Sequence, residues 1–170
     1  KELELRKNYL TSEIKTIYFG GGTPSILNKK HLEKLFDKIR NTFNVSENAE
    51  ISFECNPDDL NKEKLILLNY LGVNRLSIGI QSFDDKDLKF MNRSHNSDEA
   101  INSVKLAEEV GFDNISIDLI YSLPSQSVEN WQKNLEIAFS LNIQHISSYS
   151  LTIEKNTQLS HLIKTKNLLK

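Results

Sequence analysis

Cysteine is nearly absent from this sequence, which holds one thiol, Cys55, in 170 residues. A single cysteine cannot form a disulfide within the chain, and such a composition is typical of a reducing compartment, so we expect a cytoplasmic protein. One thiol also cannot supply the three or four cysteines that an iron–sulfur cluster usually requires. No two histidines have the spacing of metal ligands, and we therefore expect no metal-binding residues in the chain.

Long apolar runs and a strong excess of charge are also missing. No apolar run approaches the length of about 20 residues that a membrane-spanning helix needs, so we expect no membrane-spanning segment. The charged residues 1–10 have the pattern of the end of an amphipathic helix rather than of a signal peptide. The net charge of −2 gives no general reason to expect nucleic acid as a partner. With no linker rich in proline or glycine, residues 1–170 are expected to form part of one domain.

The sequence does contain a repeat of short apolar segments, each followed by small or polar residues and separated from the next by a helical pattern. Strands joined in this way pair in parallel through right-handed crossovers. The repeat predicts an α/β fold, a parallel barrel or a doubly wound sheet, with the functional residues at the carboxyl ends of the strands. The five predicted strands are 14–19, 50–54, 75–80, 115–120 and 145–149.

The helical patterns between these strands have recognisable ends. Polar residues with good N-cap propensity precede four apolar helical stripes, and we predict the caps Asn28, Asn61, Ser97 and Ser127. Five strands are too few to close an eight-stranded barrel, and the first predicted strand would lie at an unprotected edge. We therefore expect residues 1–170 to be an internal segment of a longer barrel; the alternative is a complete five-stranded open sheet.

Glycines follow the first predicted strand directly. The run from Gly20 to Gly22 could let the backbone approach a charged or polar ligand, or could form a tight turn whose exit is fixed by Pro24. The run lacks the lysine of a Walker loop and the spacing of a dinucleotide-binding motif. We favour the ligand-binding interpretation because Thr23, Pro24 and Ser25 follow.

Four polar side chains lie at or near other predicted strand ends. Glu54 could hold an ammonium group or be a solvated charge, and Gln81 could bind a ribose or purine edge or fix its own loop. Asp118 lies within an apolar strand, where a carboxylate needs donors, so we favour a ligand hydroxyl over an ion pair with Arg75 or Arg93. Arg93 in a loop could bind a carboxylate or be a surface residue. Cys55 is expected to be a buried, space-filling residue.

Taken together, these motifs resemble a radical S-adenosylmethionine family, the HemN/HemW group of oxygen-independent coproporphyrinogen III oxidases and related heme chaperones. The resemblance is closer to the chaperones, because Ser82-Phe83 follows Gln81 where the oxidases tend to carry an aspartate before the phenylalanine. The similar segments are 19–25, 54–57, 74–83, 93–95, 118–126 and 149–154.

The resemblance implies a partial (β/α) barrel that binds S-adenosylmethionine across its strand tips. The residues that match cofactor-site positions of the family are Gly21, Gly22, Thr23, Glu54, Gln81, Arg93 and Asp118. The family also holds a [4Fe–4S] cluster on a CxxxCxxC motif, which this sequence lacks and which would precede Lys1. No catalytic residue is assigned.

Three functions are considered, and the closer resemblance to the chaperones favours the first over the second. The first is a heme chaperone that binds heme and transfers it to acceptor proteins. The second is an oxidoreductase that decarboxylates coproporphyrinogen III. The third is a small-molecule-binding domain without redox chemistry.

Overall fold

The computed structural model describes residues 1–124, 126–155, 157, 160 and 161, and they are built around one parallel sheet. Each strand pairs with the next one along the chain, in the order β1-β2-β3-β4-β5. A doubly wound sheet would reverse its strand order at one point, so this order is that of a barrel segment. The prediction of a partial barrel with five parallel strands is confirmed. The strands are β1 (Ile14–Phe19), β2 (Val45–Cys55), β3 (Arg75–Gln81), β4 (Ile115–Tyr121) and β5 (His145–Ser150).

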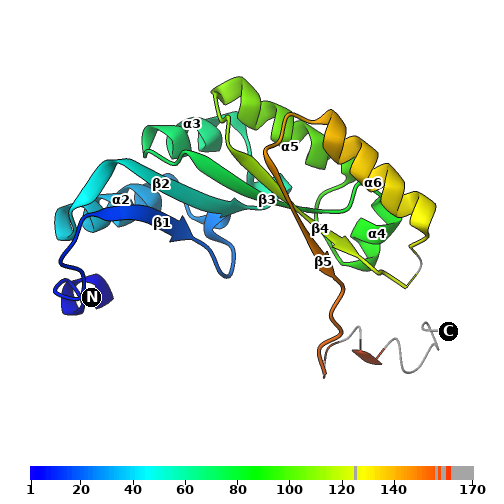
Figure 1. The fold of residues 1–170 in the computed structure, drawn as a ribbon, viewed down its shortest axis with the longest axis horizontal. Helices are drawn as coiled ribbons and strands as arrows, with labels where there is room; N and C mark the ends of the chain where they lie inside the picture. Colours follow the sequence, from blue (N-terminus) through cyan, green and yellow to red (C-terminus); the bar gives the residue numbers. More distant parts are fainter. Residues whose placement is uncertain (125, 156, 158–159, 162–170) are drawn as a thin grey trace.

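The sheet is curled, and its main helices lie along the convex face, while none of the described main helices lies on the concave face (Figure 1). Short 3₁₀ turns η1 (Pro24–Ile26) and η2 (Pro57–Asp59) follow β1 and β2. No described helix is both long and apolar enough to cross a membrane. The helices are α1 (Glu2–Leu5), α2 (Lys29–Thr42), α3 (Lys62–Tyr70), α4 (Asp85–Phe90), α5 (Ser97–Val110) and α6 (Val128–Ser140).

Three of the four predicted helix caps are confirmed, and one is wrong. The side chains of Asn28, Asn61 and Ser127 each accept a hydrogen bond from a backbone N–H of the first turn. The cap of α5 is Asn96 rather than Ser97. The carboxylate of Glu99, three residues after Asn96, accepts a hydrogen bond from the Asn96 backbone N–H, and this reciprocal pairing selects Asn96 over its neighbour.

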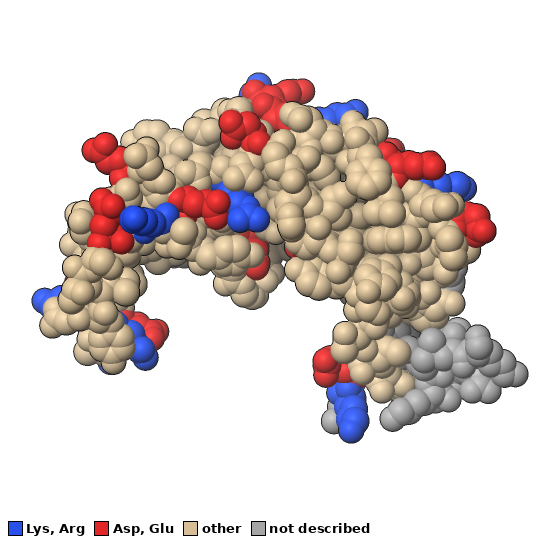
Figure 2. Space-filling model, viewed as in Figure 1, with Lys and Arg blue, Asp and Glu red and all other residues tan. Residues whose placement is uncertain are grey.

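Alternation along each strand separates an apolar face from a polar one. Phe53, Ile78 and Ile117 are fully buried in the core under the helices. Their neighbours Ser77 and Asp118 point to the concave face, and the register places Glu54 opposite Ser77. The outside of the arch carries interspersed acidic and basic side chains on the face seen in Figure 2. The concave face is therefore where polar groups from several strands can meet.

Candidate functional site

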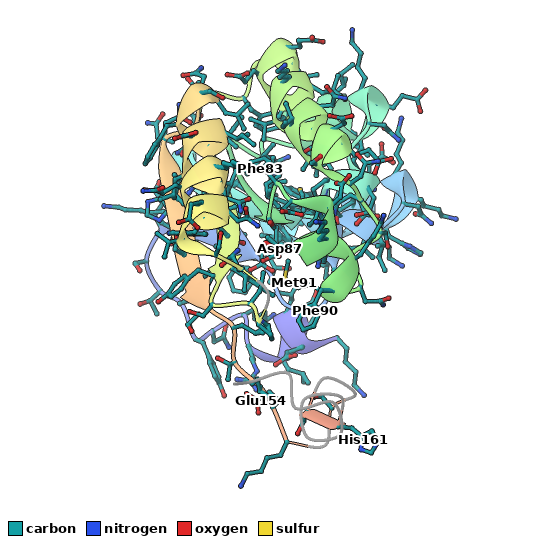
Figure 3. The ribbon with its side chains drawn as sticks, turned by 90° about the vertical axis from the view of Figure 1, so that its right-hand side faces the viewer. Phe83, Asp87, Phe90, Met91, Glu154 and His161 are labelled. Carbon is teal, nitrogen blue, oxygen red and sulfur yellow. The ribbon has the colours of Figure 1, made fainter. Side chains whose placement is uncertain are left out.

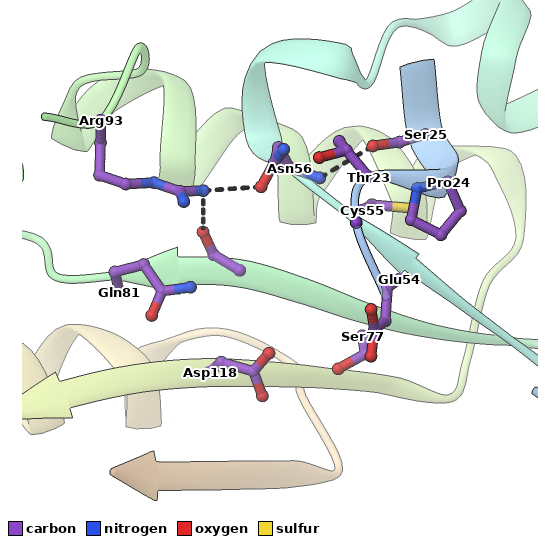
Figure 4. A pocket seen from close by; sticks show the side chains of 12 residues that line it. Thr23, Pro24, Ser25, Glu54, Cys55, Asn56, Ser77, Gln81, Arg93 and Asp118 are labelled. Carbon is purple, nitrogen blue, oxygen red and sulfur yellow. Dashed lines mark hydrogen bonds between the residues drawn. The ribbon is translucent and has the colours of Figure 1, made fainter. Parts of the chain in front are cut away.

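A pocket of about 250 Å³ opens at the carboxyl ends of β1 to β4 (Figure 4). Six of the seven predicted site residues line it, and the seventh, Gly21, is hydrogen-bonded to one of them. The convergence expected from the strand-end motifs is therefore present. The lining residues are Gly22, Thr23, Pro24, Ser25, Glu54, Cys55, Asn56, Ser77, Gly79, Gln81, Arg93 and Asp118.

The glycine loop after β1 is a turn that also forms one wall of the pocket. Gly21 and Gly22 have φ values of 77° and 61°, in the left-handed region that favours glycine. A Cβ at Gly20, the first glycine of the run, would lie closest to the ring of Tyr18 and 2.7 Å from Oε1 of Glu54, so glycine leaves room for these two side chains. The two interpretations of the glycine run, turn and cradle, are thus compatible in one structure.

Glu54 fastens this loop to β2. Its Oε1 accepts a hydrogen bond from the Tyr18 hydroxyl at 2.7 Å, and its Oε2 accepts one from the Gly21 N–H at 2.9 Å. Desolvation, followed by the hydrogen bond to Glu54, raises the pKa of Tyr18 to about 12, so the phenol stays a donor at neutral pH. Each oxygen retains a further lone pair for a cationic ligand group.

A second group of contacts, which we call the clamp, holds the segment after the glycine loop and was not predicted from the sequence. Ser25 is buried and donates to Oδ2 of Asp59 at 2.5 Å, while its hydroxyl accepts from the Asn56 N–H at 3.3 Å. The ammonium group of Lys64 in α3 donates to the carbonyls of Ser25 and Leu27. Lys64 lies in an ordinary helical pattern, so no local sequence signal could have identified it.

Asp118 lies half-buried in the middle of β4. Burial is the largest cause that raises the pKa of its carboxyl; the charge of Glu54 acts in the same direction, and the hydroxyls of Ser147 and Ser77 oppose it. The alternative of an ion pair with arginine is not observed. Arg75 contacts Glu50 at 3.2 Å, and the Arg93 contacts are given next.

Arg93 reaches the pocket from the end of α4. It donates to Oδ1 of Asn56 at 2.7 Å and to the carbonyl of Gly79 at 3.2 Å. Its Nε is buried and has no hydrogen-bond partner among the described residues. A buried donor without a partner is costly. The Nη1 group, by contrast, is not among the buried atoms and makes no hydrogen bond to the described residues, so the guanidinium can donate to a carboxylate-bearing molecule there.

Gln81 ends β3 with a φ of 68°, at an irregularity in the pairing of β3 with β4. A Cβ at Gly79 would lie 2.9 Å from its Nε2, so Gly79 leaves room for this side chain. In the described part of the chain the Gln81 amide makes no hydrogen bond that would tie down its own loop, and it faces the pocket. Both its donor and its acceptor are available to a ligand.

An iron–sulfur cluster does not fit the residues of this chain. The described residues contain no group of three His, Cys, Asp or Glu side chains that could hold a metal ion. Cys55 is buried, as expected of a space-filling residue, and desolvation raises the pKa of its thiol above the usual range. Buried, protonated sulfur is the opposite of what a cluster ligand requires.

Comparison with known proteins finds relatives that are named heme chaperones. The heme chaperone HemW of Bacillus subtilis is 41% identical over 157 residues, which are 92% of this chain and 41% of that protein. HemW of Escherichia coli is 41% identical over 145 residues, 85% of this chain and 38% of that protein. The chain thus spans about two fifths of the length of these relatives.

Solved structures agree with the sequence comparison. Coproporphyrinogen III oxidase (HemN) from Escherichia coli, a radical SAM enzyme, superposes with a TM-score of 0.83 at 29% identity, over 99% of this chain and 38% of that one. Archaeal Elp3 from Methanocaldococcus infernus, at 18% identity and a TM-score of 0.76 over 96% of this chain and 43% of that one, shares the fold. The family model of the radical SAM superfamily matches residues 2–138. The chain belongs to the radical SAM superfamily.

Proposed function

We propose that this chain forms the S-adenosylmethionine-binding part of a heme chaperone of the HemW type, a protein that binds heme and transfers it to acceptor proteins. The observation that carries the proposal is the 41% identity to HemW of Bacillus subtilis over 92% of the chain. Membership of the radical SAM superfamily implies S-adenosylmethionine and a [4Fe–4S] cluster as the cofactors. Heme is inferred from the relatives called heme chaperones.

The pocket offers complementary groups for each part of S-adenosylmethionine. Arg93, whose Nη1 makes no hydrogen bond to the described residues, would bind the carboxylate, and Glu54 would bind the amino group. Gly21, Gly22 and Thr23 would contact the methionine part, as the family resemblance suggests. Gln81 and Asp118 lie on neighbouring strands, where they would bind the ribose hydroxyls.

The chemistry of the superfamily is a one-electron reduction of the sulfonium by the cluster, which the cofactors supply and the protein positions. Because the residues of this chain do not fit a cluster, we assign to them only the binding and orientation of S-adenosylmethionine. We assign no described residue to heme binding or to contact with an acceptor protein.

The second candidate is an oxygen-independent coproporphyrinogen III oxidase, which the TM-score of 0.83 to HemN favours. One experiment separates the two. The full-length gene product, purified anaerobically with its cluster, is titrated with heme and separately incubated with S-adenosylmethionine and coproporphyrinogen III. We expect heme binding without turnover. Formation of protoporphyrinogen would contradict the chaperone assignment.

The cofactor site is tested by Asp118→Ala in the same protein. Loss of a hydrogen bond to a charged acceptor costs about 1.5–3 kcal/mol, so the affinity for S-adenosylmethionine should fall roughly 10- to 100-fold in equilibrium binding. The matched control is Asp113→Ala, since Asp113 is an exposed residue before the start of the same strand. Equal affinities of Asp118→Ala and the control would remove Asp118 from the site.

A further inference from the structure

A buried carboxylate outside the pocket joins two of the loops that form it. Asp87 of α4 is 2% exposed and lies between α4 and α6 in the view of Figure 3. Its Oδ2 accepts hydrogen bonds from the Ser82 hydroxyl at 3.1 Å and from Nε2 of Gln126 at 3.0 Å. No lysine or arginine among the described residues forms an ion pair with it. A buried acidic side chain that is held only by neutral donors calls for an explanation.

The two donors come from different strand ends. Ser82 follows Gln81, the last residue of β3. Gln126 belongs to the segment after β4, and its Oε1 accepts from the backbone N–H of Ser122 at 3.1 Å, directly after Tyr121, the last residue of β4. One oxygen of Asp87 therefore connects the carboxyl ends of two neighbouring strands.

Both connected ends carry backbone strain. Gln81 and Ser122 have φ values of 68° and 63°, a region that residues with a Cβ rarely adopt. Such conformations persist only where the surroundings over-determine them, and they gather at functional sites. Here Asn134 of α6 adds to the constraint, since its Oδ1 accepts from the Phe83 N–H and lies 3.2 Å from the Ser82 hydroxyl.

We propose that Asp87 is a positioning residue for the pocket: it fixes the ends of β3 and β4 relative to each other and so holds Gln81 beside Asp118. Gln81 pairs with Leu119, the residue after Asp118, so a shift of either strand end changes the distance between the two pocket side chains. The inference rests on the proposed function, because S-adenosylmethionine is the ligand whose affinity reports this geometry.

The test compares Asp87→Ala and Asp87→Asn in the anaerobically purified full-length protein, by equilibrium binding of S-adenosylmethionine and by thermal unfolding. Asp87→Ala removes both hydrogen bonds, and we expect about a 10-fold loss of affinity. Asparagine keeps one acceptor oxygen, and because both bonds end on a single oxygen it should retain affinity within about threefold of the wild type. Rescue by asparagine and not by alanine is the expected result.

The matched control is Asn74→Ala. Asn74 also joins two strands, accepting from the Ile51 N–H at 2.8 Å and donating to the Ala49 carbonyl at 2.9 Å, but it does so before the start of β3, at the far end from the pocket. We expect it to lower the unfolding temperature and leave the affinity unchanged. If Asp87 had only a structural role, Asp87→Ala would likewise lower the unfolding temperature and leave the affinity for S-adenosylmethionine unchanged.

A double-mutant cycle with Gln81→Ala shows whether Asp87 acts through Gln81. In that background Asp87→Ala should cause little further loss of affinity. If Asp87→Ala does not fold, Gln126→Ala removes the same connection from the β4 side and should give the same affinity loss. Wild-type protein that fails to bind S-adenosylmethionine would overturn the proposed function together with this inference. Wild-type binding with undiminished affinity in the folded Asp87→Ala or Gln126→Ala variant would overturn the inference alone.

Discussion

Single residues in the pocket are held in environments that oppose folding. Asp118 is the clearest case, because burial and the nearby charge of Glu54 raise the pKa of its carboxyl. Arg93 is another, since its buried Nε lacks a partner in the described structure. A bound ligand whose hydroxyl groups donate to Asp118 would offset the first cost, and a ligand carboxylate would pair with the charge of the Arg93 guanidinium. The same side chains therefore weaken the free protein and strengthen the complex, as is common at binding sites.

This trade-off predicts how the stability of Asp118→Asn depends on pH. The carboxyl has the ordinary pKa of 3.8 when unfolded and a higher pKa when folded. The folded state therefore prefers the protonated form, and ionised Asp118 destabilises the free protein above the folded pKa. At pH 7 the neutral asparagine variant should unfold at a higher temperature, by at most about 2–4 °C because Asp118 remains partly hydrated. The gain should shrink as the pH falls through the folded pKa and vanish well below 3.8, where the carboxyl is protonated in both the folded and the unfolded state. A gain that persists there would contradict the electrostatic cause.

Much of the pocket could be predicted at the residue scale, and the missing part has a physical reason. Glu54 lies where an alternating strand gives way to polar residues, and Asp118 is a lone carboxylate within an apolar strand, and both signals are local. The clamp formed by Ser25, Asp59 and Lys64 depends on contacts across more than thirty residues, which no local pattern encodes. The role of Lys64 emerges only when α3 packs beside the β1–α2 connection.

Among the elements, the end of α4 explains how Arg93 enters the pocket. The Asn92 N–H donates to the Lys89 carbonyl at 3.1 Å, and the Arg93 N–H donates to the Leu88 carbonyl at 2.9 Å. These are the two hydrogen bonds of a Schellman motif, with Asn92 in its left-handed position at a φ of 55°. The six-residue helix and its termination thus fix the direction in which Arg93 leaves the helix.

The left-handed position makes Asn92 sensitive to a β-branched side chain. Asn92→Val should lower the free energy of unfolding by about 1–2 kcal/mol, and Asn92→Gly should be neutral or slightly stabilising. Urea unfolding measures both. Asn69→Val is the control, because Asn69 is an exposed residue within α3, in right-handed helical conformation. Equal losses for the two valine variants would show that the turn at Asn92 is not strained.

The boundaries of elements were less predictable than their existence. β2 begins at Val45 and not at residue 50, because its first half carries polar residues that break the apolar pattern. The cap of α5 shifted by one residue because Asn96 and Ser97 are both good caps and only Glu99 distinguishes them. Helix and strand types follow from periodicity, whereas their ends depend on such local competition.

For the molecule as a whole, the repeat of strand and helix was sufficient to predict the parallel sheet. The strand order then distinguishes a barrel segment from a doubly wound sheet. A sheet that winds in one direction with helices on its outer face must leave a free inner face. The pocket lies at one end of that face, and its walls come from four strands. What the repeat could not predict is the distance between those walls, which depends on the curl and on connections such as Asp87.

The same architecture predicts a gradient of local stability across the sheet. β3 and β4 are paired on both sides, and their side chains Leu76, Ile78 and Ile117 are fully buried. β1 pairs only with β2, and β5 only with β4, among the described strands. In hydrogen exchange of this chain, the amides of β3 and β4 should exchange roughly 100-fold or more slowly than those of β1 and β5. Equal protection of the edge and central strands would contradict this gradient.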